Sequence, residues 1–421
     1  MVSLGSRSHA PDVLIVGGGP VGLAAAIALR QRGASVTVAD AMNPPIDKAC
    51  GEGLLPDSRG ELLQLGVELD NSAGTEFRGI RFVSHEENHR ATVVSALFPA
   101  QAHFDKGIGL RRQTLHRLLV ERAEGAGVSL RWNSVVSLPK RVHSFGRAHS
   151  SVGPAPSIAE NSVLVGGEAT RYGVLLGADG LASPVRRWAG LDAGVTYSRR
   201  FGFRRHYAVA PWKPYVEVHW SRRGQAYVTP TGPNEVCVAV VSRDPRCRLQ
   251  TILDEMPALA EKLSGASGAH PLDAERGALT LTRKLGRVMR GRVALIGDAS
   301  GSADAITGEG MAMGFRQALL LAECLGSSTT EDGLARYQAR HSATQRLPQR
   351  MARIMLLMDS YAALRTRAIA MLANEPRLFT RMLSVHVGAE SLRGFLAAKG
   401  MEIAWRLALP LQGNANPQTQ A

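Results

Sequence analysis

Short runs of consecutive apolar residues alternate along the chain with longer stretches in which apolar residues recur every three or four positions. Val13–Val16 and Ser35–Ala39 belong to the first kind, which is typical of buried strands in a parallel sheet. Leu23–Arg30 lies between them, is rich in Ala and Leu, and predicts a helix packed on the first strand. The beginning of the chain is therefore predicted to form a strand–helix–strand unit.

The same pattern continues through most of the chain. The later apolar or alternating runs predict strands at Arg78–Val83, Ala91–Phe98, Val128–Trp132, Val163–Val165, Tyr172–Leu176, Tyr215–Trp220, Gln225–Thr229, Val236–Val241 and in the run from Arg292 to Gly297-Asp298. The helical patterns are Ser58–Leu65, Gly109–Ala123, the short Leu181–Arg186, Thr251–Gly265, a long helix that opens at Thr307–Gly314 and ends at Leu325, and the Arg-rich region from Leu334.

The order of these elements predicts a mixed α/β (α+β) fold: a parallel-sheet domain, an inserted antiparallel β domain that forms the floor of a substrate cavity, and a helical C-terminus. The expected boundaries are 11–65, 106–190 and 285–330 for the first domain, 66–105 and 191–284 for the second, and 331–421 for the helical region. The segment 141–161, rich in Ser, Pro, Gly and His, is expected to be mobile, and the polar tail from Gln412 to be disordered.

Glycines follow the first predicted strand directly. Gly17, Gly19 and Gly22 form the pattern G-x-G-x-x-G, and Asp40 ends the second strand 23 residues after Gly17. In such a unit the first glycine makes a tight turn, the second lets the backbone approach a pyrophosphate, and the third lets helix and strand pack closely. The acid then meets a ribose hydroxyl. These features predict a dinucleotide site; the alternative is a glycine-rich turn in another α/β unit.

Two further glycine turns stand at strand ends. Asp179 and Gly180 follow the strand Tyr172–Leu176, and Gly297-Asp298 follows the strand that starts at Arg292. The next helix opens at Gly308 and Gly310, where backbone N–H groups can face a ligand. Ligands in open α/β sheets bind at the carboxyl ends of the strands, so these turns are candidates for one site.

The loop 41–56 leaves the second strand at this same end of the sheet. Two prolines and two spaced glycines mark it as a loop. Cys50, Glu52 and Gly53 are therefore candidates for the wall of an active site. For Cys50 the alternative is a small buried residue without chemistry.

The chain has 50 Lys and Arg against 36 Asp and Glu, a net charge of +14. This excess favours anionic partners, and a dinucleotide is one. Aromatic residues make up only 5% and are not interleaved with basic stretches, so nucleic acid has no support. The amphipathic segment Arg350–Leu364 allows peripheral contact with a membrane; the alternative is a set of helices packed on the core with solvated arginines.

None of the four cysteines forms a C-x-x-C pair, so a zinc or thioredoxin-type site has no support and no metal is expected. The N-terminus lacks the pattern of a signal peptide, and no apolar run is long enough to cross a membrane. A reduced, cytoplasmic location is expected.

Taken together, the three glycine turns resemble those of the FAD-dependent oxidoreductases with the p-hydroxybenzoate hydroxylase fold, also called the glutathione reductase-type class. The resemblance covers residues from about 11 to 330. It implies a Rossmann-like FAD-binding domain in which Gly17, Gly19, Gly22 and Asp40 hold the ADP half of FAD.

The resemblance also implies roles for later residues. Arg112, in the R-x-x-L register with Leu115, matches the arginine that contacts the flavin nucleotide. Asp298 matches the acid that binds the ribityl chain. Asp179 and Arg186 lie in the motif implicated in hydride transfer from transiently bound NAD(P)H. No second G-x-G-x-x-G is present, which disfavours a separate nicotinamide domain.

Two stretches, Cys50-Gly-Glu-Gly-Leu54 and Thr307-Gly-Glu-Gly-Met311, resemble geranylgeranyl reductase-like enzymes, in which a Cys in the first loop lies near the flavin. The aromatic Trp-x-Phe-Pro motif of those reductases is missing; the corresponding segment is Gln225–Pro230. The Trp-x-Trp-x-Ile-Pro motif of flavin halogenases is also missing, which disfavours halogenation.

Three functions follow from the resemblance. The first is an FAD monooxygenase that takes hydride from NAD(P)H and hydroxylates an aromatic, polyketide-like or lipid substrate. The second is an ene-reductase of a prenyl or lipid chain, with Cys50 near the reacting carbon, which suits the basic helical C-terminus. The third is a flavin-binding module without activity, which leaves the β domain without a purpose. The missing aromatic motif favours the monooxygenase. Candidate bases are His206, Tyr207, His219 and Tyr227.

Overall fold

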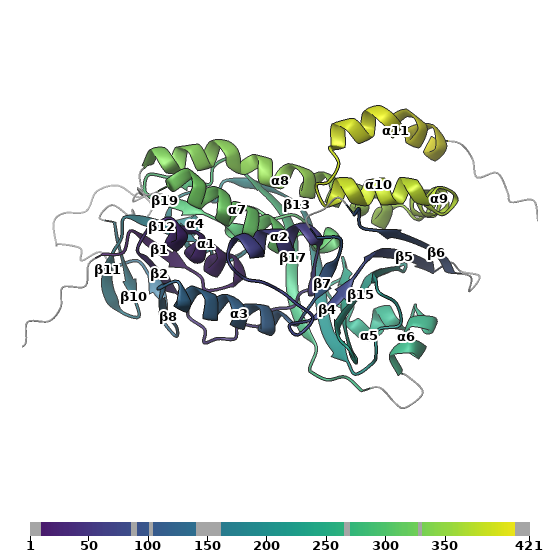
Figure 1. The fold of residues 1–421 in the computed structure, drawn as a ribbon, viewed down its shortest axis with the longest axis horizontal. Coiled ribbons are helices and arrows are strands. Elements are labelled where there is room, and N and C mark those ends of the chain that lie inside the picture. Colours follow the sequence, from purple (N-terminus) through teal and green to yellow (C-terminus); the bar gives the residue numbers. More distant parts are fainter. Residues whose placement is uncertain are drawn as a thin grey trace, which may run out of the picture.

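The computed structural model describes residues 10–85, 91–100, 104–139, 161–264, 270–326 and 331–408, with Ala91 and 404–408 described by their backbone alone. Most of the segment expected to be mobile and the tail from Gln412 lie outside the described residues. The chain has a mixed α/β fold in which two large sheets form two halves of the molecule, joined on one side by helices (Figure 1).

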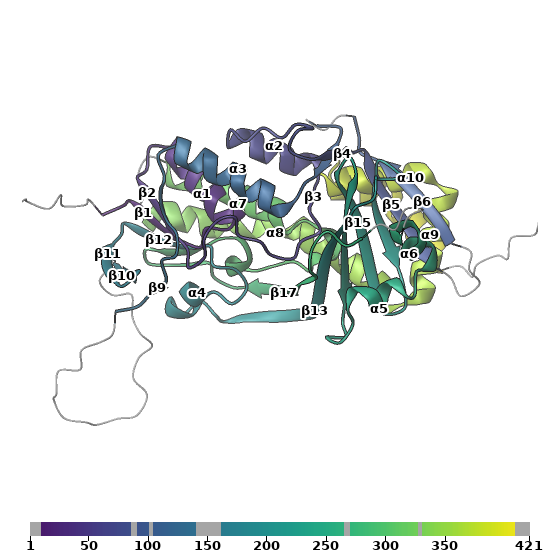
Figure 2. The same ribbon diagram turned by 90° about the horizontal axis from the view of Figure 1, so that it is seen from below.

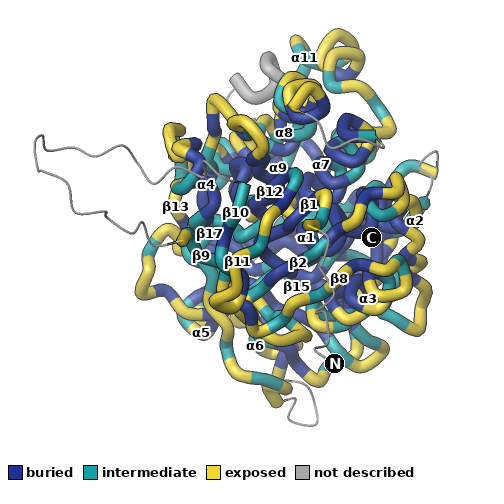
Figure 3. Tube along the Cα trace, turned by 90° about the vertical axis from the view of Figure 1, so that its left-hand side faces the viewer, coloured by how far each residue is buried: buried dark blue, intermediate teal, exposed yellow. Residues whose placement is uncertain are grey.

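The first half is built on a six-stranded sheet. Its order is β18 (Met289–Arg290), β19 (Val293–Leu295), β12 (Val174–Gly177), β1 (Val13–Val16), β2 (Val36–Ala39) and β8 (Ser129–Arg131). All neighbours are parallel except β18 and β19. The central strands β1 and β12 are buried along their whole length, as their continuous apolar sequences require. Figure 3 shows these strands as the buried centre of the molecule.

Helices pack against this sheet. The helix α1 (Pro20–Gln31) contacts α3 (Arg112–Gly125) and α7 (Gly310–Leu325), and all residues from Leu23 to Leu29 are buried. A helix that is apolar on every side belongs in the interior, which explains its run of Ala and Leu. A small antiparallel sheet of β9 (Val136–Ser137), β10 (Ser162–Val165) and β11 (Glu168–Arg171) and the short helices α2 (Pro56–Gln64) and α4 (Pro184–Trp188) complete this half.

The second half contains a seven-stranded sheet. Its order is β17 (Arg276–Leu285), β13 (Gly194–Tyr207), β16 (Glu235–Ser242), β15 (Gly224–Gly232), β14 (Val216–Trp220), β5 (Gly79–His85) and β6 (Ala91–Leu97). The sheet is not purely antiparallel as expected, because β14 and β5 run parallel. These two strands come from distant segments, so no hairpin fixes their relative direction. A three-stranded sheet of β3 (Gly53–Leu54), β7 (Gly107–Gly109) and β4 (Thr75–Phe77) adjoins it.

The strands β13 and β17 were not recognised individually in the sequence. They pair antiparallel from Gly194–Leu285 to Arg204–Arg276 and run between the two halves (Figure 2). β13 carries arginines at many positions and has an irregularity between Thr196 and Ser198, so it lacks a clean alternation of apolar and polar residues. The predicted helix over 251–265 is two helices, α5 (Leu249–Leu253) and α6 (Pro257–Ser264), because a proline disfavours helical backbone at the preceding residue.

The C-terminal region is helical as predicted: α8 (Glu331–Ser360), α9 (Ala362–Asn374), α10 (Pro376–His386) and α11 (Leu392–Ala408). α8 packs on α7 near its start and on α9 near its end, while α9 and α10 cover β6 (Figure 1). Their buried side chains share one hydrophobic cluster with β5, β6 and β14. No helix in the described part of the chain is long and apolar enough to span a membrane.

Candidate active site

One cavity of about 1020 Å³ is lined by residues of both large sheets and of the C-terminal helices. The cavity brings together turns that are far apart in the sequence. The sequence-predicted residues that line it are Gly17, Gly19, Asp40, Cys50, Arg112, Asp179, Gly180, Gly297, Asp298, Gly308 and Gly310. Gly22 does not line the cavity; it lies behind the first turn.

The first glycine turn is shaped by close packing. Gly17 has φ +109°, and a Cβ on Gly22 would lie 1.9 Å from the carbonyl oxygen of Gly17. A side chain at Gly22 would therefore push the helix off the strand. Gly19 caps α1 and has no atom near its Cβ position, so its space opens to the cavity. The N-terminus of α1, with its partial positive charge, thus faces the cavity.

Asp40 ends β2 beside this turn. Its Oδ2 accepts a hydrogen bond from the backbone N–H of Gly18 (2.7 Å), and its Oδ1 accepts one from Met42 (2.7 Å). A carboxylate has about four acceptor sites, so two bonds leave capacity for a hydroxyl donor from the cavity. Asp40 both holds the turn in shape and presents a carboxylate to a ligand.

Arg112 begins α3 at the cavity wall. Its guanidinium lies near Met311 Sδ (Nη1–Sδ 3.8 Å), and its Nε is buried without a hydrogen-bond partner among the described residues. A buried unpaired donor on a cation is costly, so this group fits an anionic ligand such as a phosphate.

Asp179 lies at the cavity, but its carboxylate caps α4. Its Oδ2 accepts a hydrogen bond from Val185 N–H (3.0 Å), and burial raises the pKa of this carboxyl group above its ordinary value. Arg186, from the same motif, is buried and bonded to Asp192 (2.6 Å), Ala299 O (3.2 Å) and Leu181 O (2.8 Å). With these partners the guanidinium braces the motif from within.

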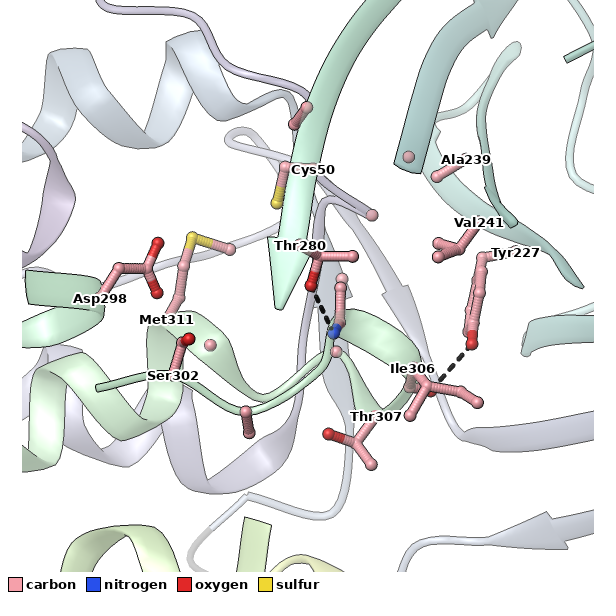
Figure 4. A pocket seen from close by; sticks show the side chains of 18 of the residues that line it. Cys50, Tyr227, Ala239, Val241, Thr280, Asp298, Ser302, Ile306, Thr307 and Met311 are labelled. Carbon is pink, nitrogen blue, oxygen red and sulfur yellow. Dashed lines mark hydrogen bonds between the residues drawn. The ribbon is translucent and has the colours of Figure 1, made fainter. Parts of the chain in front are cut away.

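Asp298 lies on the same wall. Its carboxylate is 3.5 Å from Lys48 Nζ, which comes from the loop after β2. The backbone N–H of Gly297 is bonded to Gln317 on α7 (2.8 Å), which fixes the turn. In Figure 4, Asp298 and Met311 lie on one side of the cavity and Tyr227 on the other, with Cys50 between them.

The far part of the cavity is apolar. Helices α8–α11 supply methionine, leucine, isoleucine and phenylalanine side chains, whose flexible or bulky apolar groups suit an apolar ligand of irregular shape. The lining residues there are Met351, Ile354, Met355, Met358, Met371, Leu372, Phe379, Met382, Leu383, Phe395, Leu396 and Ile403.

A buried polar cluster stands at the inner end of the cavity, around Glu52 and Arg204, which both line it. Glu52 Oε2 is 2.6 Å from His206 Nε2, and His206 Nδ1 is 2.6 Å from Asp273 Oδ2. The sequence pointed to Glu52 and His206 separately but gave no sign that they meet. Asp273 and Arg204 were missed, because nothing in their local sequence marks them as functional.

The other candidate bases lie elsewhere or have partners. Tyr227 lines the cavity and donates a hydrogen bond to Ile306 O (2.8 Å). His219 is bonded to Glu217 (3.0 Å) and to His85 (3.0 Å), and neither His219 nor Tyr207 lines the cavity. Residues on β14 alternate between its faces, so Val216 and Val218 face the cavity while His219 faces away.

Ligand atoms of Glu52, His206 and Cys237 lie within 4.8 Å of one another, the spacing of a possible metal site. Both ring nitrogens of His206 already face carboxylates, however, and burial raises the pKa of the Cys237 thiol well above its ordinary value. A protonated thiol is a poor metal ligand.

A second charged cluster lies under α2 and the start of α7. Arg316 is 3.1 Å from Asp57 and 2.9 Å from Glu61, and Glu309 is 3.6 Å from His386, which lines the cavity. Burial, followed by the charges of the neighbouring carboxylates, raises the pKa of Glu61 to about 9 although Arg316 opposes it. Three carboxylates here share one arginine and one histidine.

The residues at the inner wall fit FAD. An open glycine turn at a helix N-terminus and the unpaired Nε of Arg112 suit its phosphates, and the carboxylate of Asp40 suits a ribose hydroxyl. A bound FAD would supply the transfer of hydride or electrons to the adjoining part of the cavity. The fold and this site define a dinucleotide-dependent oxidoreductase.

Comparison with known proteins identifies the family. Residues 10–351 match the FAD binding domain family, so the chain belongs to it. A menaquinone reductase of Mycolicibacterium smegmatis is 26% identical over 343 residues, which cover 76% of this chain and 78% of that protein. The putative FAD-dependent monooxygenase YetM of Bacillus subtilis is 25% identical over 365 residues, covering 78% and 89%.

The structure of the flavin-dependent brominase Bmp2 superposes with a TM-score of 0.72 at 16% identity, covering 94% of this chain and 99% of that one. At this identity the likeness concerns the fold alone. The p-hydroxybenzoate hydroxylase fold expected from the glycine turns is confirmed, and the protein is an FAD-dependent oxidoreductase.

Proposed function

We propose that this protein is an NAD(P)H-dependent monooxygenase that hydroxylates an amphipathic substrate with a ring at one end and an apolar chain at the other. The observation that carries the proposal is the continuity of the cavity, whose wall passes from the FAD motifs to the Met-rich helices α8–α11. A ring placed at the inner end would lie beside the flavin, while the chain would bury apolar surface against these helices.

The protein's own residues would then divide the work. The glycine turns, Asp40 and Arg112 would hold the cofactor. The helices α8–α11 would bind the chain and exclude water from the reacting end, which suppresses side reactions. Asp179 and Arg186 shape a motif next to the cavity, and we infer that NAD(P)H binds transiently near it.

A second candidate function is the reduction of a double bond in a prenyl or lipid chain. Two observations favour it: Cys50 lines the cavity, and a menaquinone reductase is among the relatives. Cys50 accepts a hydrogen bond from Glu52 N–H at its Sγ (3.4 Å), so the thiol is oriented within the loop. A thiol in this position could serve as a proton donor.

One experiment separates the two functions. The FAD-loaded protein is mixed with NADPH or NADH, an alkylphenol such as nonylphenol or a prenylated quinone, and ¹⁸O₂. Monooxygenation predicts a product that carries one ¹⁸O atom and consumption of oxygen in step with the nucleotide. Reduction predicts a product with two additional hydrogens under anaerobic conditions. Nucleotide oxidation that leaves both kinds of substrate unchanged would contradict both functions.

We also propose that the mouth of the cavity docks on an anionic membrane surface, from which a lipophilic substrate enters. Ile354, Leu357 and Leu396 line the cavity and yet are 43%, 49% and 51% exposed, with Arg353 and Arg393 exposed beside them. Exposed apolar side chains next to arginines favour an interface with acidic lipids.

Sedimentation with vesicles tests the docking. We expect binding to vesicles of phosphatidylglycerol and phosphatidylcholine, weaker binding to phosphatidylcholine alone, and loss of binding in Leu357→Asp. A matched control is Leu63→Asp, at an exposed leucine that does not line the cavity. Equal binding of wild type and Leu357→Asp would refute this surface.

A further inference from the structure

Glu52 is held in an unusual position at the inner end of the cavity. It has φ +58°, which is rare for a residue other than glycine, and its side chain is 1% exposed. Its backbone carbonyl accepts a hydrogen bond from Leu110 N–H (3.0 Å), and its Oε1 accepts one from Arg112 N–H (3.0 Å). Backbone strain of this kind persists where the surroundings fix it, and it is concentrated at functional sites.

The Glu52 carboxylate continues into a chain of short hydrogen bonds. Its Oε2 is 2.6 Å from His206 Nε2, and His206 Nδ1 is 2.6 Å from Asp273 Oδ2. Glu52 lines the cavity, His206 is buried, and the side chain of Asp273 is 27% exposed. The three side chains therefore connect the cavity with solvent through a histidine that uses both ring nitrogens.

The charges around the chain are nearly balanced. Arg204 contacts Asp47 (2.6 Å), Glu52 (3.7 Å) and Asp273 (2.9 Å), and Arg276 contacts Asp47 (2.6 Å). Three carboxylates thus face two guanidinium groups, and one more proton on the cluster restores neutrality.

The remaining neighbours leave this balance unchanged. Arg111 and Glu235 are paired with each other (2.9 Å), and burial keeps Cys237 a neutral thiol. Burial by itself lowers the pKa of His206, but its hydrogen bonds with Glu52 and Asp273, and their charge, outweigh burial and raise the pKa above its ordinary value. The histidine can therefore gain and lose a proton near neutral pH.

We propose that Glu52, His206 and Asp273 form a proton relay between an ionisable hydroxyl on the substrate ring and solvent. Glu52 takes the proton from the hydroxyl oxygen and passes it to His206 Nε2. The histidine releases the proton on Nδ1 to Asp273, which gives it to water. One proton moves from substrate to solvent and no electrons are transferred. Glu52 is the group that meets the substrate, and the other two transmit the proton.

This relay rests on the proposed function for its substrate, but its test does not need turnover. The FAD-loaded protein is mixed with nonylphenol in weak buffer, and a pH-indicator dye records the proton that the bound phenol releases. In wild type we expect prompt release. In Glu52→Gln and His206→Gln we expect the rate to fall about 10²-fold, the size of a general acid–base contribution. Asp273→Asn, which changes the partly exposed end, should slow release about tenfold.

A matched control comes from the neighbouring strand. His219 is also buried and bonded to a glutamate, Glu217 (3.0 Å), but neither residue lines the cavity. His219→Gln should therefore release the proton at the wild-type rate. Imidazole added to His206→Ala should restore at least a tenfold faster release, which a merely structural histidine would not allow.

Several outcomes would overturn the relay. Unchanged release rates in Glu52→Gln and His206→Gln, with normal FAD content and melting temperature, would do so. Equal slowing in His219→Gln, or slow release in His206→Ala without rescue by imidazole, would also do so. If His206→Gln fails to fold, Asp273→Asn and the imidazole rescue still decide. If wild type releases the proton but yields no hydroxylated product in the ¹⁸O₂ experiment, the proposed function fails and the relay stands.

Discussion

The two ends of the cavity are built in different ways. At the inner end, backbone turns at strand ends form the wall, and few side chains reach into it: Gly17, Gly19 and Gly297 have none to offer. At the outer end, the wall consists of flexible methionine and leucine side chains on packed helices. A rigid, backbone-lined end suits one fixed cofactor, whereas the side-chain-lined end can adapt to ligands of different shape.

The largest effect is expected where the inner end depends on close packing. Gly22→Val would place atoms within 1.9 Å of the Gly17 carbonyl, so the helix must move and the turn must open. We expect complete loss of bound FAD, measured by the flavin absorbance of the purified protein. Gly60→Ala in α2 is the control, because nothing lies near its Cβ position. Normal FAD content in Gly22→Val would contradict this view of the inner end.

The next effect separates packing from ligand contact. Gly19 has no protein atom near its Cβ position, so Gly19→Ala should leave the melting temperature of the apoprotein unchanged. The new methyl group would occupy the space where we expect the pyrophosphate. FAD affinity should fall by about 10²-fold, in line with about 3 kcal/mol of lost charged hydrogen bonds. Fluorescence titration of the apoprotein measures the dissociation constant; an unchanged value would place the phosphates elsewhere.

Arg112→Met tests the unpaired donor at the same end. The substitution keeps much of the apolar stem and removes the cation, whose Nε has no partner among the described residues. Hydrogen bonds to charged groups contribute about 1.5–3 kcal/mol, so the FAD dissociation constant should rise about 10- to 100-fold. Arg117→Met on the exposed side of α3 is the control. Equal affinity in both variants would exclude Arg112 from the cofactor site.

The outer end should respond differently. Met355→Gln places a polar amide in the apolar lining without altering the FAD turns. Burying an amide without a partner costs about 1–3 kcal/mol, so the KM for a long-chain alkylphenol should rise about tenfold. The kcat and the KM for an unsubstituted phenol should stay within twofold. If both substrates are affected alike, the outer end does not bind the chain.

The smallest effect concerns stability beside the cavity. The pKa of Glu61 is raised to about 9 in the folded protein, so folding binds a proton that the unfolded chain has lost above its ordinary pKa near 4.5. Stability is therefore lost as pH rises from about 4.5 toward 9. Glu61→Gln should raise the melting temperature by a few degrees at pH 8, about 1 kcal/mol, and by less at pH 5. An equal shift at both pH values would contradict this assignment.

Local sequence determined the fold class and the inner end of the cavity. The turn from Gly17 to Gly22 and its acid Asp40 form one strand–helix–strand unit, so the residues that meet are close in the chain. Their spacing follows from backbone geometry that few residue types allow. The same reasoning placed Asp298, Gly308 and Gly310 on one wall, because parallel strands end at the same edge of a sheet.

Tertiary structure decided what the sequence left open. Glu52 and His206 are 154 residues apart and meet only because β13 joins the sheet beneath the loop after β2. The apolar outer end depends on how α8–α11 pack over β5, β6 and β14, and their amphipathic sequences fit either a membrane or a core. The parallel pairing of β5 with β14 belongs here too. Pairing of distant segments is governed by the burial of the whole sheet, which no local pattern records.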